Sequence, residues 1–205
     1  MHLEASDLPD ITEVPPEFIE TLQVSERNVF HAPCQIKLPD QGTTPSSTWK
    51  SMVLSDFIET RMYLTRWLDR KIQSKFGRTP PKKSDQEAWT LLRSNEPPLV
   101  HLLLSMDQKI CNRVMKDMLY QLIEKCEANP EYIIPPDWSL WFYSILARFE
   151  KPLPVGIEAN LRSLLRTICS IRSVITTDRL LTEPLKTALS GIDILVCVLT
   201  EYFKV

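Results

Sequence analysis

Histidine and cysteine are the residue types in this chain that could supply acid–base, nucleophilic or metal chemistry. The three histidines are far apart, and only His101 lies outside the N-terminal region, within an apolar stretch. The five cysteines include no CxxC pair, and none is spaced from a histidine as zinc ligands are. Their odd number and scatter predict reduced cysteines of a cytosolic or nuclear protein. We therefore expect neither a metal site nor another cofactor.

The motifs of common enzyme classes are also missing from the sequence. No nucleophile elbow, phosphate-binding loop, HExxH or dinucleotide fingerprint occurs. Glu150 and Lys151 are adjacent, so on a helix their side chains would point apart rather than form an acid–base pair. With only four glycines, phosphate-binding loops and tight hairpins are disfavoured. The sequence thus predicts a protein that is not an enzyme.

Residues 61–83 could instead contact phosphates, because they contain eight Lys or Arg residues against one acid, Asp69. The net charge of the whole chain is −2, however, which argues against a general nucleic-acid binder. Two interpretations stay open. One is a helical protein that binds RNA through 61–83, and the other is a solvated helix face that leads into a flexible loop.

Residues 138–149 carry large apolar side chains at i, i+3, i+4, i+7, i+8 and i+11, the spacing of one helix face. Asp137 can cap this helix, and Lys151-Pro152 ends it because proline disfavours helical backbone before it. A second face is also fairly apolar, so the helix needs cover on two sides. One cover should be the domain's own core. The other could be more of the same chain or a partner. The second face comprises Leu140, Tyr143, Ser144 and Ala147.

The remaining periodic segments also predict helices, and none alternates at period two over strand length. We expect an all-α fold, an irregular bundle of about seven helices. No run is long and apolar enough to span a membrane. Helices are predicted to begin at or near Thr48 (continuing to Phe76), Ser84 (in a capping box), Leu99, Asp107, Asp137, Pro154 and Thr182.

Residues 1–47 differ from this helical domain, which we place at 48–205. Up to Phe30 they hold seven acidic residues and one basic residue, Arg27. They read as a largely extended acidic arm with one short helix after Pro15-Pro16, which would be marginal alone. The arm is either a loose acidic tail or a segment that orders on a partner.

Several stretches resemble the survival motor neuron (SMN)-interacting protein family, that of the second Gemin subunit of the SMN complex. WFYSILARFEKPLP, residues 141–154, resembles the signature W-x-Y-x-L-L-A-x-L-E-K-P-L. IDILVCVLTEYF, residues 192–203, resembles the closing L-x-L-L-x-C-L-V-x-x-Y-F, and EPPLVHLLLSMDQ, residues 96–108, resembles F-P-P-L-L-S-x-x-x-x-M-N-Q. Trp49, Phe57 and Arg61 keep the spacing W-x7-F-x3-R. VPPEFIETLQVSE in the arm also resembles a family segment, so the resemblance runs in order through most of the chain.

The resemblance implies a non-catalytic assembly factor, a scaffold and chaperone for the spliceosomal snRNP core. In that family the helical domain binds an amphipathic helix of SMN and one side of an open pentamer of Sm proteins. The arm crosses the pentamer, which is held before snRNA is loaded, so any contact with snRNA would be indirect. Cytoplasmic and nuclear localisation follows from the same resemblance, with no membrane partner. The arm residues implied to bind Sm proteins are Pro15, Pro16, Phe18, Ile19 and Leu22.

A second implied surface lies on the helical domain. Family members often carry a basic residue just before the signature tryptophan, able to pair with an acidic residue of SMN. Here that position is Leu140, so this contact would be lost or replaced by an apolar one. The candidate partner-binding residues are Trp138, Leu140, Trp141, Tyr143, Arg162, Arg166, Arg172 and Tyr202.

Overall fold

The computed structural model describes residues 45–69, 81–82, 85–175 and 183–205. Within these ranges the chain forms seven α-helices and a final π-helical turn, with no strand, which confirms the predicted all-α bundle. The predicted arm and its short helix lie almost wholly outside the described residues. The elements are α2 (Ser47–Asp69), α3 (Gln86–Asn95), α4 (Val100–Ser105), α5 (Gln108–Ala128), α6 (Pro136–Arg148), α7 (Val155–Val174), α8 (Glu183–Cys197) and η3 (Val198–Phe203).

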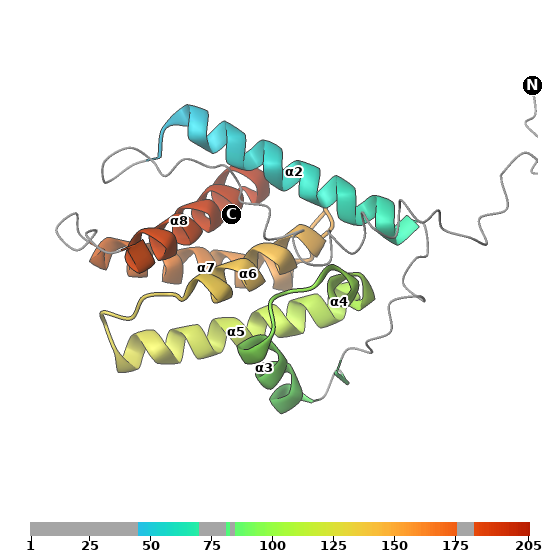
Figure 1. The fold of residues 1–205 in the computed structure, drawn as a ribbon, viewed down its shortest axis with the longest axis horizontal. Coiled ribbons are helices and arrows are strands. Elements are labelled where there is room, and N and C mark those ends of the chain that lie inside the picture. The colour runs from blue at the N-terminus through green and yellow to red at the C-terminus, as the bar shows by residue number, and fades with distance from the viewer. Residues whose placement is uncertain (1–44, 70–80, 83–84, 176–182) are drawn as a thin grey trace, which may run out of the picture.

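Helix α8 is central, because it packs against α2, α6 and α7. Figure 1 shows α2 along one edge of the bundle and α5 with α3 along the opposite edge, with α6, α7 and α8 between them. In the sequence, residues 192–199 are apolar except for Asp193. Ile192, Leu195 and Val198 are indeed fully buried. Burial on several sides is the usual fate of a helix without a polar face.

Helix α2 begins where the sequence predicts, with the Ser46 hydroxyl accepting a hydrogen bond from the Trp49 amide at 3.2 Å. Its predicted continuation to Phe76 lies beyond the described residues. The inner face of the helix carries buried apolar side chains at helical spacing: Trp49, Val53, Phe57, Leu64 and Trp67.

The predicted capping residue is confirmed for α5, but those predicted for α3 and α6 are not. The carboxylate of Asp107 accepts from the Ile110 amide at 2.7 Å, as expected. Asp85, however, caps α3 in place of Ser84, which lies outside the described residues. Helix α6 begins at Pro136, one residue before the predicted Asp137 cap, because proline lacks the amide that a first helical position leaves unpaired. Asp137 instead lies in the first turn, where its charge favours the helix dipole.

The last helix changes its geometry before it ends, which the sequence does not predict. The α-helical pattern stops at Cys197 and continues as the π-helical turn η3. Lys204 then takes the left-handed conformation with φ of 60°, and the Val205 amide bonds back to the Leu199 carbonyl at 3.3 Å. The wider π turn alters the direction of the side chains that follow, including Tyr202.

Candidate protein-binding site

Five side chains meet where α2, α6 and η3 come together. The buried ring of Phe57 lies edge-on to Tyr143 on α6, with centroids 5.3 Å apart, and to Tyr202 on η3, at 5.0 Å. The guanidinium of Arg61 lies 5.2 Å from the Tyr202 centroid, and the Lys151 ammonium lies 4.2 Å from it. We call Phe57, Arg61, Tyr143, Lys151 and Tyr202 the aromatic–cationic cluster.

Arg61 is held in the cluster by the end of α6. Its Nη1 donates to two carbonyls in the last turn of α6, those of Leu146 at 3.3 Å and Ala147 at 3.0 Å, where the helix cannot pair all of its own carbonyls. A positive charge there also complements the negative end of the helix dipole. Arg61 opens the basic segment that could bind RNA, but its Nη1 is engaged within the protein. Residues 70–80 and 83–84 of that segment are not described, so RNA binding stays a prediction.

Lys151 follows α6 directly and covers the other side of Tyr202. Its ammonium donates to the Tyr202 carbonyl and lies 5.6 Å from the Phe203 centroid. Burial lowers the pKa of Lys151, and the nearby charges of Lys204 and Arg61 lower it further. Tyr143 and Tyr202 are half-buried and Lys151 is exposed. The cluster therefore presents aromatic edges and positive charge that a carboxylate of a partner could meet.

The structure separates the α6 candidates. Trp141 is only 1% exposed, and its indole N–H donates to the Glu96 carbonyl at 3.1 Å. It lies in the core of the described structure, and a part for Trp141 in partner binding stays a prediction. Trp138 is half-buried against Phe142, with ring centroids 6.5 Å apart. Leu140 is half-buried and shares a face with Tyr143, three residues on.

The three candidate arginines of α7 also divide. Arg162 is exposed and pairs with Glu158, and the exposed Arg166 donates from Nε to the Arg162 carbonyl at 3.3 Å. Arg172, a candidate partner-binding residue, is half-buried and pairs with Asp193, which is 3% exposed. Burial raises the pKa of Asp193, and the hydrogen bond from Arg172 opposes that rise. Arg172 thus ties α7 to α8, and α7 packs against α5 and α8 rather than forming the cluster.

Two buried arginines were missed by the sequence reasoning. Arg148 donates from Nε to the Leu103 carbonyl and from Nη2 to the Met106 carbonyl, both at 3.0 Å, and burial lowers its pKa. Arg93 is 8% exposed, and burial lowers its pKa as well. The signal available for Arg148 was its position in a helix predicted to be covered on two sides, where a charge must bond to something.

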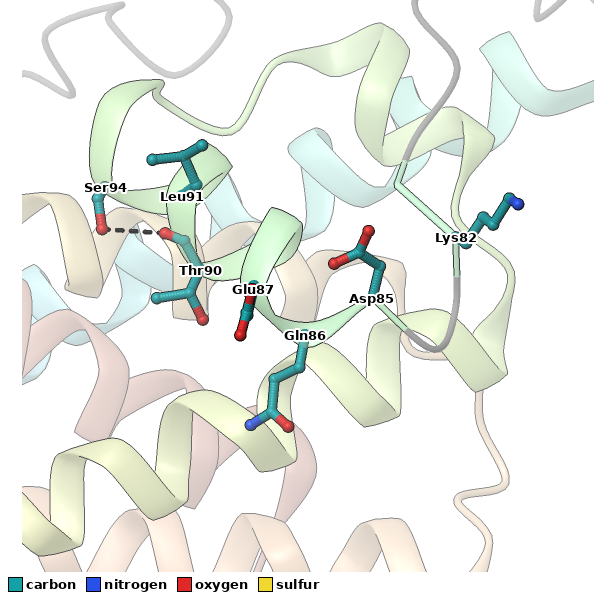
Figure 2. A pocket seen from close by; sticks show the side chains of 7 residues that line it. All are labelled: Lys82, Asp85, Gln86, Glu87, Thr90, Leu91 and Ser94. Atoms are coloured by element: carbon teal, nitrogen blue, oxygen red, sulfur yellow. Dashed lines mark hydrogen bonds between the residues drawn. The ribbon is translucent and has the colours of Figure 1, made fainter.

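An open depression of about 920 Å³ lies over the start of α3 (Figure 2). The Ser94 hydroxyl donates to the Thr90 carbonyl at 2.9 Å, and the Thr90 hydroxyl accepts from Arg93 and Gln121. The Asp85 carboxylate caps α3 at Ala88. No histidine or cysteine lines the depression. Its lining is Lys82, Asp85, Gln86, Glu87, Thr90, Leu91 and Ser94.

Two further features bear on the class of site. In the described part of the chain, no three His, Cys, Asp or Glu side chains are grouped so that they could hold a metal ion. None of the helices in those same ranges has the length and apolar character needed to cross a membrane. The polar side chains with perturbed pKa values that we describe, such as Arg148 and Asp193, are engaged in joining helices.

These features define the class of the protein as an all-helical domain with a partly exposed aromatic–cationic surface. The model of the family described as survival motor neuron (SMN) interacting protein 1 (SIP1) matches residues 1–205. The chain therefore belongs to the SIP1 family, and the resemblance read from the sequence is confirmed.

Relatives of this chain are similar at low identity but over long spans. Gem-associated protein 2 of Mus musculus is 20% identical over 99% of this chain and 80% of its own length. The Xenopus laevis protein of the same name is 23% identical over 100% of this chain and 84% of its own. A chain in the solved structure of the 8S snRNP assembly intermediate has the same fold, with a TM-score of 0.61 and 18% identity over 94% of this chain and 96% of that one.

Proposed function

We propose that this protein is a non-catalytic assembly factor of the SMN complex that binds SMN and holds a pentamer of Sm proteins for spliceosomal snRNP core assembly. The observation that carries the proposal is the family match along residues 1–205. The fold shared with a chain of the 8S snRNP assembly intermediate supports it. Its place of action would be the cytoplasm and the nucleus, and its contact with snRNA would be indirect.

The SMN helix would dock beside the aromatic–cationic cluster. Leu140 and Tyr143 lie on one face of α6 and are both half-buried, so they could receive the apolar side of an amphipathic helix. An acidic residue of that helix could pair with Lys151, whose ammonium is exposed at the end of α6. This ion pair would take the place of the one that many family members can form with a basic residue at the position of Leu140.

The Sm pentamer would be bound by the helical domain and by the arm. Seven acidic residues before Phe30 would complement a basic ring surface and oppose early entry of RNA. Within the arm the apolar contacts are assigned to Pro15, Pro16, Phe18, Ile19 and Leu22. Exposed Arg162 and Arg166 on α7 form a separate positive face, which leaves room for a second partner.

Co-expression with an SMN-derived helix and five Sm subunits, followed by size-exclusion chromatography, tests the proposal. Both partners are expected to co-elute with the chain. Deletion of residues 1–30 should weaken binding of the Sm pentamer and leave binding of the SMN helix unchanged. Lys151→Glu should weaken binding of the SMN helix. Lys109 is an exposed lysine on α5, and Lys109→Glu should leave this binding unchanged. If neither partner co-elutes, the proposed function fails. If both lysine variants behave alike, the docking surface on α6 is wrong.

A further inference from the structure

Helix α2 has an exposed face without charge. Five residues spaced by four, three, four and three positions run along it, and we call them the α2 seam: Ser51, Ser55, Ile58, Met62 and Thr65. Ile58 is 43% exposed and Met62 is 48% exposed, and Met52 beside them is 44% exposed. Among the described residues, α2 thus holds three of the six large exposed hydrophobic side chains.

The α2 seam has the properties of a helix–helix contact that lacks its second helix. Alternating steps of four and three are the spacing by which one helix packs along another. The hydroxyls of Ser51 and Thr65 donate to their own helix carbonyls, at 3.0 Å and 2.9 Å, so covering them would leave no donor unpaired. Figure 1 shows α2 at the edge of the bundle, with the other helices on its inner side.

Residues 15–26 of the same chain have a complementary sequence. Pro15, Phe18, Leu22 and Ser25 are spaced by three, four and three positions, with Ile19 beside them. A large side chain such as Phe18 would fit over the small Ser51 or Ser55. A helix of this length is marginal in water unless its apolar side is covered.

The arm is attached at the right place to reach the seam. Glu26 and Pro45 are 19 residues apart, which can span about 60 Å, and the 23 residues of α2 extend about 35 Å. A tether of this length can hold its two ends at an effective concentration on the order of millimolar. Weak contacts are therefore enough for docking within one molecule.

We propose that residues 15–26 dock as a short helix on the α2 seam when no partner holds them. The arm then covers an apolar face of its own domain, and the seam becomes accessible only when the arm is released. This docking requires neither SMN nor Sm proteins, so it can be tested independently of the proposed function.

Oxidation of Met62 by hydrogen peroxide, followed by peptide mass spectrometry on the full chain, tests the docking. Leu22→Asp should release the segment and raise the oxidation rate of Met62, about threefold if about two thirds of the wild-type molecules are docked and therefore protected. Leu8→Asp, an equal change of charge outside the segment, should leave the rate unchanged. The buried Met115 and Met118 report whether the fold itself has opened.

Three results would overturn the docking. The first is an equal Met62 rate in the wild-type chain and in Leu22→Asp. The second is protection of Met62 that grows with protein concentration, which would make a second copy the occupant. The third is a wild-type rate that is fast until an SMN-derived helix is added, which would assign the seam to an external helix.

Discussion

Trp141 is the residue at which stability and partner binding can be separated. It is 1% exposed and donates its indole N–H to the Glu96 carbonyl. Trp141→Ala is expected to lower the free energy of unfolding by about 3–5 kcal/mol, as truncations of large buried aromatic residues do. Urea unfolding followed by circular dichroism measures the loss.

Trp141→Phe is the matched control, because it keeps most of the buried volume and loses the hydrogen bond. Its cost should be clearly smaller than that of Trp141→Ala. A Trp141→Ala variant with unchanged stability and lost binding of the SMN helix would place the indole in an interface and contradict its assignment to the core.

Asp193 predicts a dependence of stability on pH. Its pKa is raised by burial, so the folded state binds the proton more tightly than the unfolded state. Stability should therefore fall as pH rises from about 4, the ordinary aspartate value, through the folded-state pKa, and then level off. Asp193→Asn removes this contribution, so the variant should gain stability relative to wild type as pH rises to neutral.

Urea unfolding of wild type and Asp193→Asn across this pH range provides the test. A difference that instead shrinks with rising pH would mean that the ion pair with Arg172 outweighs the cost of burying the carboxylate. The second oxygen of Asp193, Oδ2, is buried without a hydrogen-bond partner among the described residues, which is consistent with that cost.

The sequence indicates which residues of the site are apolar, but not how its cations are used. Periodicity places Trp141 and Tyr143 on two different faces of one helix, but it does not indicate which face is exposed to solvent. Arg61 bonds to a carbonyl 85 residues away, and Lys151 to one 51 residues away. Backbone carbonyls carry no sequence signal, so these contacts follow only from the packing of α2, α6 and η3.

At the scale of elements, the crossing of α6 and α8 depends on Gly191. A Cβ there would lie 2.8 Å from Cβ and Oγ of Ser139. Gly191→Ala is therefore expected to destabilise the protein by about 1–3 kcal/mol, because the two helices would have to separate. Thermal melting measures the effect.

Gly156 supplies the comparison, since a Cβ there meets nothing within 4 Å and the residue lies in α7. Gly156→Ala should stabilise by about 0.4–1 kcal/mol by restricting the unfolded chain. Adding Ser139→Gly to Gly191→Ala should recover part of the loss. If both glycine variants behave alike, the crossing is not limited by this contact.

The helices themselves were largely predictable, since apolar spacing and caps such as Asp107 are local signals. The exceptions occur where two neighbouring residues could both start or cap the helix. Pro136 starts α6 ahead of Asp137, and Asp85 caps α3 although Ser84 precedes it. The change to π geometry after Cys197 has no marker in the composition of the chain, and η3 contacts α2, which is distant in sequence.

At the scale of the whole molecule, the arrangement of helices was not predictable from periodicity, whereas the family was recognisable from its motifs. An apolar face indicates that another element packs against the helix, but it does not indicate which element. The central place of α8 could be foreseen because it lacks a polar face. The edge position of α2 could not, since the buried residues of α2, such as Trp49, Val53 and Phe57, are apolar like most buried residues of the other helices.

The arm provides the prediction that separates the two proposals. Phe18→Ala combined with Ile19→Ala should weaken binding of the Sm pentamer and leave binding of the SMN helix unchanged, because the arm is assigned to Sm contacts alone. Release of a weakly docked segment should change the free energy of unfolding by less than about 1 kcal/mol. Pull-down of each partner beside a melting curve gives all three quantities. A loss of SMN binding would mean that the arm helps to form the SMN surface. Unchanged pentamer binding would instead confine the role of residues 15–26 to the α2 seam.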